Sequence, residues 1–91
     1  MKVRVHVIVS GVVQGIGFRA SVRNEASMAG VNGYVRNLSD GRVEAVFEGE
    51  RTDVQNMIEY CEHGPSGAEV DDVEVKKEEF RNEFGSFSVR Y

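Results

Sequence analysis

Cysteine, proline and long apolar runs are all scarce in this 91-residue sequence. The single cysteine, Cys61, excludes an internal disulfide and suits a reducing cytoplasm. With one proline and no repeat or low-complexity tract, the chain offers no linker between domains. No apolar run approaches the roughly 20 residues of a membrane span, and no apolar block near the N-terminus predicts a signal peptide. We therefore expect one cytoplasmic domain over residues 1–91 that has no membrane association.

Positive charge is also in short supply. The chain has 11 Lys and Arg against 15 Asp and Glu, which gives a net charge of -4. A negative net charge argues against general affinity for nucleic acids or anionic membranes. The segment 42–48 carries glutamates where an RNA-binding domain with a comparable sheet would carry its aromatic signature. Any anion site on this chain must therefore be a local concentration of positive potential.

Hydrophobic periodicity predicts an alternation of strands and helices. Residues 3–9, 32–38 and 42–48 alternate apolar and polar positions as half-buried strands do, and Asp40-Gly41 predicts a two-residue hairpin with positive φ at both positions. Apolar residues recur at helical spacing over 18–29, before Gly30, and over 52–63, before Gly64-Pro65.

Capping and the C-terminal third complete the predicted architecture. Thr52 and Gln55 match a capping box at the start of the second helix. A fourth strand begins at Val70, and residues 87–91 alternate as a short terminal strand. The order predicts an α+β fold, a ferredoxin-like βαββαβ sandwich. In this fold an antiparallel sheet carries two helices on one face, here with a short extra C-terminal strand.

The segment from Ser10 to Arg19 has the composition of an anion-binding loop. Gly11, Gly15 and Gly17 lie between a strand and a helix, where glycine lets consecutive N–H groups turn toward a ligand. The helix start adds free N–H groups, and Arg19 adds a guanidinium that can bind two phosphate oxygens. A tight connection with a solvated arginine explains the same residues equally well.

Two nucleotide motifs compete for this loop. Gly15, Gly17 and Ala20 satisfy G-x-G-x-x-A, but the next strand enters a hairpin and the chain is too short for a doubly wound sheet. The phosphate-binding loop of nucleotide hydrolases is excluded because its Lys-Ser/Thr ending is missing.

The sequence resembles the acylphosphatase family in two separate places. The first is the run Val9-Ser10-Gly11-Val12-Val13-Gln14-Gly15-Ile16-Gly17-Phe18-Arg19, and the second is Gly33-Tyr34-Val35-Arg36-Asn37 followed by Gly41-Arg42-Val43-Glu44. The end of the chain, Phe87-Ser88-Val89-Arg90-Tyr91, is also similar, whereas the charged run 74–83 departs from the family pattern.

This resemblance implies a small, metal-free hydrolase that acts on small acyl phosphates, and we expect it to be a stand-alone enzyme and a monomer because nothing in the sequence demands more. It would release a carboxylate and inorganic phosphate. By the same analogy, Arg19 binds the phosphoryl group, Asn37 orients the attacking water, and the segment Gln14, Gly15, Ile16, Gly17, Phe18 and Arg19 holds the phosphate. A non-catalytic module that binds phosphorylated metabolites is the alternative. From its spacing alone, Asn37 would be no more than a polar residue near a turn.

Other groups of polar residues predict no second site. Cys61 lies on the apolar face of the second helix, and its spacing from His6 and His63 matches no zinc motif, so we expect neither a metal nor a cofactor. Asp71-Asp72 and Glu78-Glu79 surround basic residues, which is typical of a solvated, charge-mixed segment.

Overall fold

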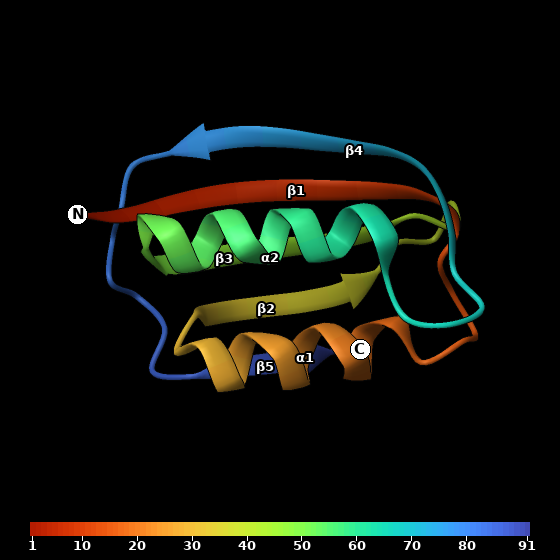
Figure 1. The fold of residues 1–91 in the computed structure, drawn as a ribbon, viewed down its shortest axis with the longest axis horizontal. Coiled ribbons are helices and arrows are strands. Elements are labelled where there is room, and N and C mark those ends of the chain that lie inside the picture. The colour runs from red at the N-terminus through yellow and green to blue at the C-terminus, as the bar shows by residue number, and fades with distance from the viewer.

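The computed structural model describes residues 1–91, and its elements follow the predicted order (Figure 1). The strands and helices are β1 (Lys2–Val12), α1 (Phe18–Ala29), β2 (Asn32–Asn37), β3 (Val43–Glu50), α2 (Arg51–His63), β4 (Glu69–Glu78) and β5 (Phe87–Arg90). Neither helix is long and apolar enough to cross a membrane.

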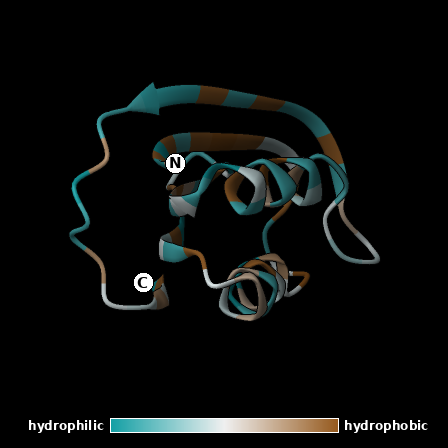
Figure 2. Ribbon diagram, turned by 60° about the vertical axis from the view of Figure 1, so that its left-hand side comes forward, coloured by the Kyte–Doolittle hydropathy of each residue, from teal (hydrophilic) through white to brown (hydrophobic).

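The five strands form one sheet in the order β4-β1-β3-β2-β5. β1 pairs antiparallel with β3 and β4, and β2 pairs antiparallel with β3. β5 lies parallel to β2, so the terminal strand makes the sheet mixed. Both helices cover the same face of the sheet (Figures 1 and 2). The predicted ferredoxin-like fold class is confirmed.

Alternation along β1 and helical spacing on α1 and α2 build the core. Val5, Val7 and Val9 are buried on one side of β1, beneath the two helices. Val22 on α1 and Cys61 on α2 face them and are wholly buried. Burial raises the pKa of the Cys61 thiol to about 12, so the thiol stays neutral.

The structure corrects where the predicted loop begins. Residues 10–12 continue β1, and the register shifts by a bulge between Ser10 and Gly11. Gly11 has φ +124°, and a Cβ there would lie 2.1 Å from the backbone oxygen of Glu69. Gly11 therefore serves the close approach of β1 to β4, and only Gly15 and Gly17 belong to the loop before α1.

Two local predictions about turns and caps were wrong. The β2–β3 connection is not a two-residue turn, because its loop includes Ser39 and only Gly41 has positive φ. The carboxylate of Asp40 instead accepts a hydrogen bond from the Arg42 N–H, which lowers the pKa of Asp40. No capping box forms either: α2 begins at Arg51, without a side-chain cap.

A buried carboxylate fastens the segment that leads into β5. Glu48 is 3% exposed, and its oxygens accept hydrogen bonds from the backbone N–H groups of Arg81, Asn82 and Glu83 at 2.9–3.1 Å. Its other partner is the guanidinium of Arg4, at 3.4 Å. Burial raises the pKa of Glu48, but these hydrogen bonds and the arginine outweigh burial and leave the pKa below its ordinary value. The charged run that departs from the family pattern thus orients the approach to β5.

Candidate active site

The loop between β1 and α1 presents a concentration of unpaired backbone donors. Val13 and Phe18 anchor its two ends in the core. Between them, Gly15 and Gly17 have φ +77° and +78°, which an L side chain adopts only at a cost. The backbone N–H groups of residues 14–20 donate no hydrogen bond within the protein. Unpaired loop donors beside the positive end of a helix dipole suit an anion.

The side chain of Gln14 turns away from this surface and ties the loop to the β2–β3 connection. Its Nε2 donates to the backbone oxygens of Leu38 at 2.8 Å and Arg42 at 2.9 Å. Those two residues flank the turn that directly follows Asn37. One amide therefore fixes the distance between the anion-binding loop and the end of β2.

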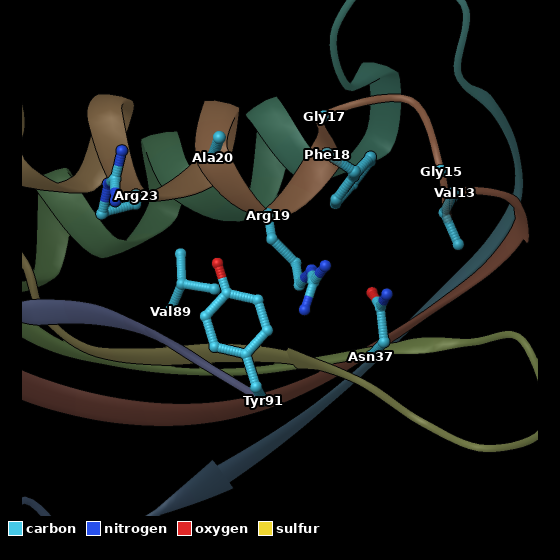
Figure 3. Close-up of a pocket in the computed structure, with 10 residues that line it drawn as sticks. All are labelled: Val13, Gly15, Gly17, Phe18, Arg19, Ala20, Arg23, Asn37, Val89 and Tyr91. Carbon is cyan, nitrogen blue, oxygen red and sulfur yellow. The ribbon is translucent and has the colours of Figure 1, made fainter.

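A cavity of about 240 Å³ lies between the loop, α1 and the ends of β2 and β5 (Figure 3). Its lining residues are Val13, Gly15, Gly17, Phe18, Arg19, Ala20, Arg23, Asn37, Val89 and Tyr91. None of them is acidic or a histidine. Of the residues expected to bind substrate, Gly15, Gly17, Phe18 and Arg19 line the cavity, whereas Gln14 and Ile16 do not.

Arg19 and Asn37 come together in this cavity from different elements (Figure 3). Arg19 forms no ion pair, and its guanidinium carbon lies 4.7 Å from the centre of the Tyr91 ring. Asn37 is the last residue of β2, and its Oδ1 is buried without a hydrogen-bond partner. A buried acceptor without a partner is costly, so this oxygen suits a donor such as water.

The sequence analysis missed five residues that line the cavity: Val13, Ala20, Arg23, Val89 and Tyr91. Arg23 lies one helical turn after Arg19, and this i, i+4 spacing alone could have placed it on the same face of α1. Val89 and Tyr91 reach the cavity only because β5 pairs in parallel with β2. No local pattern in the sequence reveals a parallel pairing between segments so far apart.

No group of three or more His, Cys, Asp or Glu side chains is placed to hold a metal ion. His6 instead lies 2.8 Å from Glu44 through its Nε2. The chemistry available in the cavity is thus positive charge, backbone donors and one free amide oxygen, without a carboxylate or an imidazole.

Comparison with known proteins decides the family. The acylphosphatase family model matches residues 5–89. The chain belongs to the acylphosphatase family. It is 57% identical to an acylphosphatase from Roseiflexus sp. (strain RS-1), over 94% of this chain and 92% of that protein.

Solved structures of other family members share the fold over nearly the whole chain. An acylphosphatase from Coxiella burnetii superposes with a TM-score of 0.93 at 39% identity, covering 98% of this chain and 93% of the other. An acylphosphatase from Bacillus subtilis superposes with a TM-score of 0.94 at 35% identity, covering both chains fully. The resemblance noted in the two sequence runs is thereby confirmed.

Proposed function

We propose that this member of the acylphosphatase family hydrolyses small acyl phosphates in the cavity between the β1–α1 loop and Asn37. The observation that carries this assignment is the juxtaposition of two unsatisfied features. One is the row of free backbone N–H groups over residues 14–20, and the other is the buried, unpartnered Oδ1 of Asn37. The first feature suits a phosphoryl group and the second a water molecule beside it.

The loop and Arg19 bind the phosphoryl group in this proposal. The N–H groups between Gln14 and Arg19 surround its oxygens, and the Arg19 guanidinium donates to two of them. Charge accumulates on these oxygens during transfer, so prearranged donors lower the barrier. Because Arg19 has no carboxylate to release, its whole charge is available to the substrate.

Asn37 positions the nucleophile. Its Oδ1 accepts a hydrogen bond from water, which directs a lone pair of that water toward phosphorus. The new bond joins the water oxygen to phosphorus, and the bond from phosphorus to the acyl oxygen breaks. The electron pair leaves with the carboxylate, a good leaving group that needs no acid.

The proton of the water goes to the phosphate itself. Asn37 has no proton that titrates in the working range, and the cavity contains no carboxylate or imidazole. The immediate products of an acyl phosphate dianion and water are therefore a carboxylate and dihydrogen phosphate, which keeps both protons of the water, with no enzyme base and no metal in the reaction. We expect no alkaline inflection in kcat that follows a His or Glu of the protein.

The proposal includes a monomeric, cytoplasmic enzyme formed by residues 1–91. Arg19 and Asn37, the two residues of the proposed chemistry, line one cavity within a single copy of the chain, which is compatible with a monomer. The lone thiol, Cys61, is buried in the core and forms no disulfide, which is compatible with a reducing compartment.

The test is the hydrolysis of benzoyl phosphate with EDTA present. Arg19→Ala and Asn37→Ala should each lower kcat/KM by about 10²–10³, the usual loss of one prearranged donor or positioning group. Arg51→Ala and Asn24→Ala are matched controls, because both side chains are exposed and outside the cavity. Turnover that survives both cavity variants, or that needs metal, would contradict the assignment. Phosphate binding without turnover in the wild type would indicate a binding module.

A further inference from the structure

The cavity extends beyond the groups that the proposed reaction requires. The loop and Arg19 bind the phosphoryl group, and Asn37 positions the water. Arg23, Val89 and Tyr91 line the same cavity but have no role in that reaction. Figure 3 shows Arg23 and Val89 toward one end and Asn37 toward the other, with Arg19 and Tyr91 between them. Arg23 and Val89 thus lie next to the expected phosphoryl position, on the side away from Asn37.

In-line displacement assigns that side to the acyl group. Attack by a water held at Asn37 requires the leaving oxygen to point away from Asn37. The leaving carboxylate and the carbon chain attached to it therefore extend past Arg19 toward Arg23 and Val89. This step depends on the proposed reaction, because Asn37 defines the direction of attack.

Arg23 brings a second uncompensated positive charge to this end of the cavity. The two arginines lie on one face of α1, about 6 Å apart along the helix axis because four residues rise 1.5 Å each. The arginines that do form ion pairs are Arg4, Arg36 and Arg42, whereas Arg23 forms none. On a protein with a net charge of -4, a pair of free arginines in one cavity is a local basic site.

We propose that Arg23 is a specificity residue that favours acyl phosphates whose acyl group carries its own carboxylate. The phosphoryl group binds at the loop and Arg19, and a distal carboxylate two or three carbons away reaches the Arg23 guanidinium. Val89 contacts the intervening methylene groups. The substrate class is the monoacyl phosphate of a short dicarboxylic acid, in preference to that of a neutral acid.

The distal carboxylate does not change its charge during the reaction, so Arg23 binds it equally in the ground state and the transition state. Uniform binding of this kind lowers KM without raising kcat. Because Arg23 is exposed, the effect is that of a screened ion pair, about three- to fivefold in KM. The preference should also weaken as the salt concentration rises.

The experiment compares succinyl phosphate with acetyl phosphate for the wild type, Arg23→Gln and the charge-matched control Arg51→Gln. Arg51 is exposed at the start of α2, forms no ion pair, and lies outside the cavity. We expect Arg23→Gln to raise KM about three- to fivefold more for succinyl phosphate than for acetyl phosphate, as a screened pair predicts. Arg51→Gln should change neither substrate.

Two outcomes overturn the inference while leaving the proposed function intact. One is a KM that stays the same for both substrates in Arg23→Gln, and the other is an equal rise in KM for both, which would place Arg23 on the phosphoryl group. A wild type that hydrolyses neither substrate would instead contradict the proposed function. Calorimetry with succinyl phosphonate and acetyl phosphonate, which are not hydrolysed, tests the Arg23 preference without turnover. Equal affinities of the wild type for the two phosphonates would overturn it.

Discussion

Replacing Gln14 by leucine tests whether Gln14 positions the phosphate-binding loop relative to Asn37 without itself binding the phosphoryl group. The Gln14 side chain lies outside the cavity and donates two hydrogen bonds across to the β2–β3 connection. Leucine has a similar size but no donor, so the link between the loop and the end of β2 is lost. The donors on the loop itself are backbone groups that the substitution does not remove.

The structure sets the size of the stability effect. Both acceptors keep a backbone donor, because the Gly41 N–H reaches the Leu38 oxygen at 3.2 Å and the Leu38 N–H reaches the Arg42 oxygen at 2.8 Å. No buried oxygen is left unpaired, so the loss is the net value of two ordinary hydrogen bonds, about 1–2 kcal/mol of unfolding free energy. Urea denaturation measures it.

The effect on catalysis should be larger than the effect on stability. A shift of about 1 Å between phosphoryl group and water can cost on the order of 10²-fold in rate. We expect Gln14→Leu to lower kcat by about 10- to 100-fold on that basis, with little change in the inhibition constant of inorganic phosphate. Steady-state hydrolysis of benzoyl phosphate, with phosphate as a competitive inhibitor, gives both values.

Gln14→Glu sharpens this test through its pH dependence. An ionised carboxylate would face two carbonyl oxygens and be repelled by them, whereas the protonated carboxyl donates one hydrogen bond. Activity relative to the wild type should therefore rise as the pH falls. A Gln14→Leu variant that keeps its kcat would refute the positioning role. If phosphate inhibition weakened as much as kcat fell, Gln14 would be a direct ligand of the phosphoryl group.

Two further predictions concern the supports of the site. Gly17→Ala should lower the free energy of unfolding by about 1–2 kcal/mol through backbone strain alone, because φ is +78° and a Cβ would meet no atom within 4 Å; denaturation of this variant beside Ala20→Gly measures it. Glu48→Gln should lower the free energy of unfolding by about 2 kcal/mol at neutral pH. The contribution of Glu48 depends on a lowered pKa, so it is complete above the ordinary value of 4.5 and disappears as the pH falls through the lower folded value. Wild type and variant should therefore converge in acid, and a constant difference down to pH 2 would contradict this role.

The fold was predictable because its elements have strong local patterns. Alternation in β1 and β3 and helical spacing in α1 and α2 reflect the same burial that holds them in the core. The errors occurred where a neighbouring strand or a short turn outweighs local preference. Gly11 is required by the close approach of the β4 backbone. At the start of α2, the Arg51 N–H donates to the backbone oxygen of Met1, and no side chain caps the helix.

The candidate site was only partly predictable. Gly15, Gly17 and Arg19 lie within five consecutive residues, so composition and the following helix indicate an anion site. Asn37 matters because the fold brings it into the same cavity as Arg19, and no spacing in the sequence encodes that proximity. Only the family resemblance singled it out. Arg23 depends on which face of α1 the cavity touches, and Val89 on the parallel pairing of β5 with β2. These are properties of the tertiary structure.

The loop of unpaired N–H groups has a consequence for how this protein can vary. Main-chain donors are common to every residue except proline, so exchanging side chains along residues 14–18 leaves the donors themselves in place. An inserted or deleted residue, in contrast, would rotate every following N–H away from the anion, while Val13 and Phe18 hold both ends in the core. The length of this loop is therefore constrained in its own right, in addition to the residue identities at Gln14, Gly15, Gly17 and Phe18.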